Sequence, residues 1–152
     1  MKELKVGDKM PLFGAKDQNG NDFFAESLLG KKVLVIFFYP KNETPACTKE
    51  ACSFRDKYQD IKDAGAEVIG ISGDSEKSHQ KFAKNHNLQY VLLSDSDKKL
   101  RQAFGVPTSL FGLLPGRVTY VVDLNGTIQM VYNSISDKGH VSNALATIKK
   151  LQ

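Results

Sequence analysis

The stretch that decides the fold runs from Val33 to Cys52 and reads VLVIFFYPKNETPACTKEAC. Residues 32–39 are mainly apolar and rich in Val, Ile and Phe, which is typical of a strand buried at the centre of a sheet. Pro40 ends that strand. A helix is predicted next, because apolar residues recur at helical spacing up to a stop at Gly65. The residues of this apolar face are Cys47, Ala51, Phe54, Tyr58 and Ile61.

The flanking sequence alternates between strand and helix signals. Before the central strand, residues 17–20 (DQNG) predict a turn that joins two short extended segments. After the first helix, strands are expected at 67–72 and 90–94, helices at 75–86 and 97–104, and an irregular loop at 106–116. A hairpin with an Asn-Gly turn is predicted over 117–132, followed by a closing helix with apolar residues from Val141 to Leu151.

This order predicts an α/β fold with a mixed central sheet flanked by helices and preceded by an N-terminal hairpin. We expect one domain over residues 1–152, a length that suffices for a single core. A thioredoxin-like fold fits the order, and a flavodoxin-like sheet is also compatible with the pattern alone.

Composition narrows the function classes. The formal net charge is +4, and no run of like charges indicates a nucleic-acid-binding tail. The N-terminus lacks the apolar core of a secretory signal, and the apolar run at 33–39 is too short to span a bilayer. We therefore expect a cytoplasmic protein that binds neither nucleic acid nor membrane.

Two cysteines, Cys47 and Cys52, lie close together in the chain. In a reducing compartment such a pair is more often catalytic, redox-active or metal-binding than structural. Thr44 is a plausible N-cap and Pro45 suits the first helical position, so Cys47 falls in a first turn exposed at the end of a central strand. The free N–H groups and the helix dipole there favour a thiolate. The alternative is that both cysteines are small, buried apolar side chains.

The spacing of the pair limits what it can do. Five residues along an intact helix, Cys52 is turned by about 140° and raised by roughly 7.5 Å relative to Cys47. Their Cα atoms are then about 9 Å apart, beyond the roughly 7 Å that a disulfide spans. A bridge would require the first turns to unwind, unlike a C-x-x-C pair. Two cysteines without clustered His also supply too few ligands for zinc.

Residues 40–52, PKNETPACTKEAC, resemble the active-site segment of peroxiredoxins, whose signature is P-x-x-x-T-x-x-C. The second cysteine five residues after the first resembles the bacterioferritin comigratory protein (peroxiredoxin Q) group. The resemblance also covers GDKMPLF (7–13), VLVIFFYP (33–40) and GRVTYVVDLNG (116–126). It implies a thioredoxin-like fold and a thiol peroxidase that needs no metal, haem or flavin.

The resemblance also assigns roles residue by residue. It implies that Cys47 is the peroxidatic cysteine, that Cys52 is the resolving cysteine, and that Pro40 shields the thiolate. Thr44 would offer its hydroxyl to the thiolate and peroxide, and Arg117 would be the active-site arginine. This group commonly has Gly where the chain has Ala46, which affects fine substrate preference rather than the chemistry. Glu50 either orients Arg117 through an ion pair or is a solvated carboxylate.

The implied reaction reduces hydrogen peroxide or organic hydroperoxides. The Cys47 thiolate becomes a sulfenic acid, which condenses with Cys52 to an intramolecular disulfide. Thioredoxin or a glutaredoxin would then reduce that disulfide. The group resembled is often monomeric, and a monomer is expected. Two alternatives are a thioredoxin-like disulfide oxidoreductase, which the C-x-x-x-x-C spacing argues against, and a non-enzymatic redox sensor.

Overall fold

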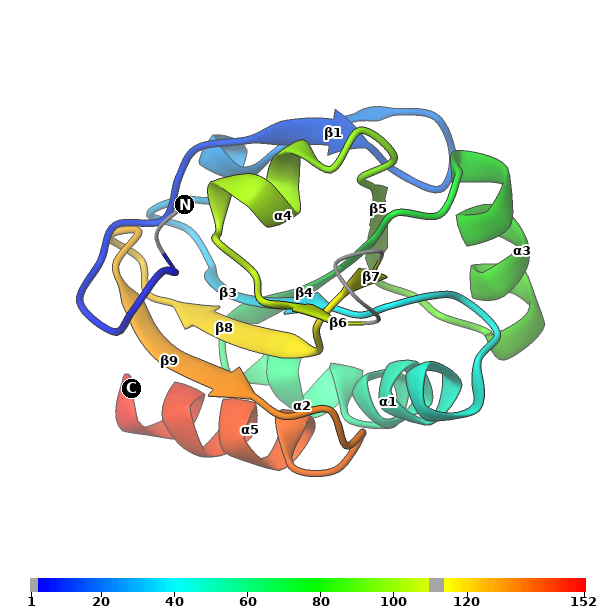
Figure 1. The fold of residues 1–152 in the computed structure, drawn as a ribbon. Coiled ribbons are helices and arrows are strands. Elements are labelled where there is room, and N and C mark those ends of the chain that lie inside the picture. Colours follow the sequence, from blue (N-terminus) through cyan, green and yellow to red (C-terminus); the bar gives the residue numbers. More distant parts are fainter. Residues whose placement is uncertain (1–2, 110–113) are drawn as a thin grey trace.

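The structure, a computed structural model, describes residues 3–109 and 114–152. Within these residues the centre is a five-stranded mixed sheet with the order β5-β4-β3-β8-β9 (Figure 1). Strands β3 (Val33–Phe38), β4 (Ala66–Ser72) and β5 (Val91–Ser94) run parallel to one another. Strands β8 (Val118–Val122) and β9 (Ile128–Asn133) complete the sheet in antiparallel pairing. The predicted mixed sheet is confirmed.

Strand β3 lies at the centre because both of its faces are apolar. Alternate side chains enter two separate cores, with Val35 and Phe37 in one and Leu34 and Ile36 in the other. Each fully buried side chain of this size contributes about 1.5–3 kcal/mol of burial free energy. The sheet must therefore be covered on both sides.

Helices and a hairpin provide that cover (Figure 1). The first core holds residues of α1 (Pro45–Asp56), α2 (Tyr58–Asp63), α3 (Glu76–His86) and α5 (His140–Lys150). The second holds residues of the short 3-10 helix η1 (Ala25–Ser27) and of α4 (Lys99–Ala103). The predicted N-terminal hairpin, β1 (Gly14–Lys16) and β2 (Asp22–Phe24), packs on the second side. This three-layer arrangement is the thioredoxin-like fold.

Two predicted elements differ from the structure. The helix expected up to Gly65 is broken at Lys57, which separates α1 from α2. A straight helix over 45–64 would be about 30 Å long, whereas a seven-residue strand such as β4 spans about 23 Å. The bend at Lys57 lets Ile61 return to the core, where it is fully buried.

The second difference lies in the segment 106–116, for which an irregular loop is predicted. Strand β6 (Thr108–Ser109) pairs there with β7 (Leu114–Pro115), and the N–H of Gly116 donates to the carbonyl of Pro107 at 2.6 Å. Strands of two residues are too short to show an alternating pattern in the sequence. Residues 110–113 of this predicted loop lie outside the described residues.

No helix in the described part of the chain combines the length and apolarity needed to cross a membrane.

Candidate active site

The candidate site lies where β3 ends and α1 begins, at the carboxyl end of the parallel strands. The connecting loop is held by Asn42, which is 6% exposed. Its side-chain oxygen accepts a hydrogen bond from the Tyr39 hydroxyl at 2.6 Å, and its backbone N–H donates to Asp74 Oδ2 at 2.9 Å. Neither Asn42 nor Asp74 carries a functional signal in the sequence, because nothing in the local pattern shows that the loop reaches the end of β4. Their contacts fix the start of α1.

The start of α1 agrees with the sequence prediction. Thr44 is the N-cap residue with extended backbone angles, and Pro45 follows at the first helical position. The Thr44 side chain makes no capping bond; its hydroxyl donates instead to the carbonyl of Lys41 at 2.8 Å. Cys47 therefore lies in the first turn, where backbone N–H groups have no partners within the helix. Ala46 is partly buried in the same turn, and Pro40 is partly buried where the loop leaves β3.

Arg117 contacts the sulfur of Cys47 although the two residues are 70 positions apart. Strand β8 pairs with β3, and the register Phe38↔Val118 places Arg117 beside the end of β3. The Arg117 Nη2 atom donates to Cys47 Sγ at 3.3 Å. The guanidinium nitrogen is thus close enough to donate a charge-assisted hydrogen bond to the sulfur. The expected pairing of thiol and guanidinium is thus present in the structure.

Cys47 is not exposed, in contrast to the prediction that a thiol in this first turn opens to solvent. Only 1% of the residue is accessible, and it belongs to the core cluster that includes Tyr39 and Ala51. The cause is tertiary: Arg117, itself 3% exposed, lies against the sulfur. The sulfur is therefore enclosed between the first turn of α1 and the start of β8.

Three acceptors fix the Arg117 guanidinium. Besides the Cys47 sulfur, Nη1 donates to Glu50 Oε1 at 2.7 Å and Nε donates to the carbonyl of Ile135 at 2.9 Å. Burial disfavours the charged form of Arg117 and lowers its pKa, but the nearby Glu50 and Cys47 raise the pKa by more. The pKa of Arg117 is therefore raised overall, and its guanidinium stays charged. The sequence left two interpretations of Glu50, an ion pair with Arg117 or a solvated carboxylate. The structure contains the contact with Arg117, and Glu50 is fully buried rather than solvated.

Burial also acts on Glu50 itself. Desolvation raises the pKa of Glu50 to about 8, although the charge of Arg117 and its hydrogen bond lower it. Behind Glu50 lies His140 at the start of α5, also fully buried, with Nδ1 3.4 Å from Glu50 Oε2. The Thr119 side-chain oxygen is 2.7 Å from the same nitrogen. His140 carries no signal in the sequence, since its neighbours become visible only when β8 and α5 pack together.

Cys52 lies five residues after Cys47 in α1 and is partly exposed. Both cysteines are free, and α1 is unbroken from Pro45 to Asp56. Helix geometry then separates their Cα atoms by about 9 Å, which is too far for a disulfide. In this conformation the two thiols cannot bridge.

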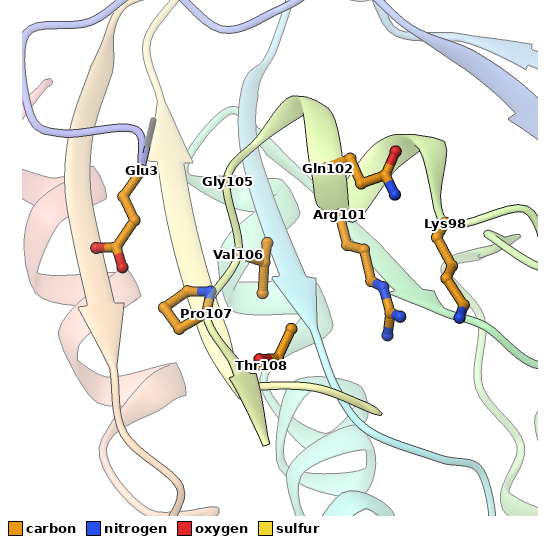
Figure 2. Close-up of a pocket in the computed structure, with 8 residues that line it drawn as sticks. All are labelled: Glu3, Lys98, Arg101, Gln102, Gly105, Val106, Pro107 and Thr108. Carbon is orange, nitrogen blue, oxygen red and sulfur yellow. The ribbon is translucent and has the colours of Figure 1, made fainter. Parts of the chain in front are cut away.

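A separate groove lies on the other side of the sheet. Figure 2 shows it between the N-terminal segment at Glu3 and the side chains of Lys98, the N-cap of α4, and Arg101, within α4. Its volume is about 500 Å³. Neither cysteine nor Arg117 lines this groove. Among the described residues there is also no group of three or more His, Cys, Asp or Glu side chains that could hold a metal ion.

Comparison with known proteins identifies the class. The sequence matches the AhpC/TSA family over residues 6–131. Peroxiredoxin Q of Sedum lineare, a chloroplastic protein, is 50% identical over 151 residues, which are 99% of this chain and 81% of that protein. The crystal structure of peroxidoxin BcpB from Mycobacterium tuberculosis is 37% identical, covers 99% of both chains and superposes with a TM-score of 0.92. A bacterioferritin comigratory protein of Xanthomonas campestris is 28% identical with a TM-score of 0.85, over 95% of this chain and 99% of that one.

The chain belongs to the AhpC/TSA family and is a thiol peroxidase. Within that family its relatives are peroxiredoxin Q and bacterioferritin comigratory proteins, which confirms the resemblance seen in residues 40–52. The plant relatives are named as chloroplastic, so the cytoplasmic location expected from the sequence stays a prediction.

Proposed function

We propose that Cys47 is the peroxidatic cysteine and that Arg117 stabilises both its thiolate and the breaking O–O bond. The observation that carries this proposal is the 3.3 Å contact from Arg117 Nη2 to Cys47 Sγ at the first turn of α1. The thiolate attacks the terminal oxygen of a hydroperoxide, an S–O bond forms, and the O–O bond breaks. Cys47 becomes a sulfenic acid, and the departing hydroxide or alkoxide takes up one proton.

Charge builds up on the departing oxygen in this step. A guanidinium held by Glu50 and the Ile135 carbonyl is already oriented to stabilise that charge. Thr44, whose hydroxyl is bonded to the Lys41 carbonyl, would turn that hydroxyl toward the bound peroxide. Pro40 would shield the sulfur from water. Hydrogen peroxide and organic hydroperoxides are both proposed as substrates, and the Xanthomonas campestris protein is described as reducing alkyl peroxides.

Resolution by Cys52 is the second proposed step. The Cys52 thiol attacks the sulfenic sulfur, an S–S bond forms and water leaves. Because an intact α1 holds the two residues about 9 Å apart, the first turns of the helix must open. Opening breaks the helical bond from Thr48 N–H to the Thr44 carbonyl, 2.9 Å long, and the contact of Arg117 with the sulfur. Oxidation is thereby coupled to local unfolding.

The disulfide is then reduced by an external dithiol of the thioredoxin or glutaredoxin type, which returns both thiols. We propose that the protein works as a monomer of one domain, residues 1–152, in the cytoplasm. The proposal of a monomer rests on the resemblance to a group that is often monomeric. Light scattering on the reduced and oxidised protein tests the oligomeric state.

Two matched variants test the roles of the cysteines. Cys47→Ser is expected to abolish peroxide turnover. Cys52→Ser is expected to reduce one equivalent of peroxide and then stop as a sulfenic acid, which mass spectrometry detects after trapping with dimedone. Full turnover in both variants, measured as peroxide consumption with a thioredoxin system, would show that the assignment is wrong.

A further inference from the structure

One oxygen atom in the buried cluster behind Cys47 has no hydrogen-bond partner among the residues that the structure describes. It is Oε2 of Glu50, whose side chain is fully buried, while its other oxygen accepts from Arg117. A buried carboxylate oxygen without a donor is costly. The nearest candidate is His140 Nδ1 at 3.4 Å, on a side chain that is also fully buried. A proton held between these two atoms would give Oε2 the partner that it lacks.

The other contacts of His140 determine where its protons are. Its Nε2 atom lies 3.0 Å from the carbonyl of Ser134 and 3.1 Å from the carbonyl of Ser136. Carbonyl oxygens only accept, so Nε2 carries a hydrogen. Nδ1 of a neutral ring then has only a lone pair, which faces the Thr119 hydroxyl at 2.7 Å and Glu50 Oε2 at 3.4 Å. The Thr119 hydroxyl can donate to this lone pair, but an ionised Glu50 Oε2 has no hydrogen to offer it. An ionised Glu50 beside a neutral His140 would place lone pair against lone pair, whereas one proton on either atom removes the conflict.

The charges in the cluster lead to the same result. With Cys47 as a thiolate, Glu50 ionised and His140 neutral, two negative charges face the single positive charge of Arg117. Such an imbalance is unfavourable in a site closed to water. One added proton makes the cluster neutral. After oxidation to the sulfenic acid the cysteine is uncharged, and Arg117 with an ionised Glu50 is neutral without that proton.

We propose that Glu50 and His140 hold one shared proton while Cys47 is a thiolate, and that this proton is given up when Cys47 is oxidised. The pair acts through Arg117 and does not touch the peroxide, so both are positioning residues. The inference rests on the proposed role of Cys47. Its consequence is that the site keeps the same net charge before and after reaction with the peroxide.

The remaining groups around the pair agree with this assignment. Burial raises the pKa of Glu50 and lowers the pKa of His140, so the proton resides mainly on Glu50. Asp137, partly buried before α5, raises the pKa of both groups. Tyr39 and Tyr90 also face the cluster, but burial raises the pKa of each phenol, so both remain neutral.

The test is a proton count during a single turnover. Reduced Cys52→Ser protein is mixed with one equivalent of hydrogen peroxide in weakly buffered solution with an indicator dye. Thiolate and hydrogen peroxide give sulfenic acid and hydroxide, and the hydroxide takes its proton either from solvent or from the pair. We expect proton uptake from solvent near zero per sulfenic acid formed, rising to about one when Glu50→Gln is added, because the amide cannot supply a proton.

Controls separate this result from other causes. A neutral Cys47 thiol would also give no uptake, so thiolate absorbance is measured in each variant before mixing. His79→Gln removes another fully buried histidine, which contacts Asn42 rather than Glu50, and it should leave uptake near zero. Infrared difference spectra of the Cys52→Ser protein provide a second readout without altering the pair: a buried protonated carboxyl band should disappear on oxidation.

The outcomes are distinct. Uptake of about one proton in the Cys52→Ser protein, with Cys47 shown to be ionised, would overturn the shared proton. So would near-zero uptake that persists in Glu50→Gln, or a carboxyl band absent from the reduced protein. If no sulfenic acid forms at Cys47 at all, the proposed function fails together with the inference, and dimedone trapping identifies that case.

Discussion

Replacement of Arg117 by lysine tests how the guanidinium works. Arg117 divides its N–H groups among Cys47 Sγ, Glu50 Oε1 and the Ile135 carbonyl, at 3.3, 2.7 and 2.9 Å. Lysine keeps the positive charge but has a single nitrogen, which cannot reach three separated acceptors in the same geometry. We expect the lysine nitrogen to stay with Glu50 Oε1, the nearer acceptor at 2.7 Å, rather than with the Cys47 sulfur at 3.3 Å. The Cys47 sulfur then loses its donor.

The size of the effect follows from the lost contact. A hydrogen bond to a charged group contributes about 1.5–3 kcal/mol, and loss of one fixed donor to a developing anion typically costs about 100- to 1000-fold in rate. Arg117→Lys should therefore lose about 2–4 kcal/mol of transition-state stabilisation, a roughly 30- to 1000-fold fall in the second-order rate constant with peroxide. Folding should be weakened by about 1–3 kcal/mol, because Glu50 is left with a poorer partner.

The assay is stopped-flow measurement of Cys47 oxidation under excess hydrogen peroxide. The matched control is Arg101→Lys, since Arg101 of α4 lines the groove of Figure 2, which neither cysteine lines. The control should react at the wild-type rate. If Arg117→Lys, with its fold intact by circular dichroism, reacted within about threefold of wild type, fixed donation to the sulfur would not be what accelerates the step.

Three other measurements probe the described geometry. Glu50 keeps its proton up to a pKa of about 8 in the folded protein but ionises in the ordinary acidic range when unfolded, so stability should fall as pH rises between them. Folding lowers the pKa of His140, so below the ordinary pKa of histidine this group makes stability rise with pH and opposes the effect of Glu50. Near pH 7 the effect of Glu50 remains, with a slope of up to about 1.4 kcal/mol per pH unit. Urea titrations of Glu50→Gln should lack that slope, and an unchanged slope would contradict the burial argument. Gly70→Ala should destabilise by about 1–3 kcal/mol, because a Cβ there would lie 2.8 Å from Phe37 Cζ and 2.9 Å from Leu92 Cδ2; Gly73→Ala, with no neighbour closer than 3.7 Å, is the control. Finally, a bulky disulfide reagent should modify the partly exposed Cys52 before Cys47, which is 1% exposed, and the reverse order in native reduced protein would show that the sulfur is more open than described.

The local sequence predicts much of the fold, and the reason is visible in particular elements. The helix α3 begins where the sequence predicts a helix, after the N-cap Ser75, whose side chain accepts from Ser78 N–H at 3.1 Å. The turn at Gly126 joins β8 to β9 with a φ of 80°, a conformation that glycine adopts without strain. These features depend on neighbours within a few residues. Such signals can be read from the chain itself.

Other features depend on distant residues and are not predictable in this way. The break at Lys57 arises because a longer helix would outrun the strands beneath it. The pair β6–β7 and the anchoring of Asn42 on Asp74 join segments with no shared local pattern. The exposure predicted for Cys47 is wrong for the same reason, since the group that encloses the sulfur comes from a strand 70 residues away.

By itself the sequence determined the order of the five sheet strands and the main helices, the placement of Cys47 at a helix start and the kinship with peroxiredoxins. These depend on short-range periodicity, capping and a contiguous motif. Only the tertiary structure decided that the sulfur is enclosed, that Glu50 pairs with Arg117, and that His140 lies behind them. The physical reason is that burial and charge pairing depend on which surfaces meet across β3, β8 and α5, and each of these surfaces comes from a different part of the chain.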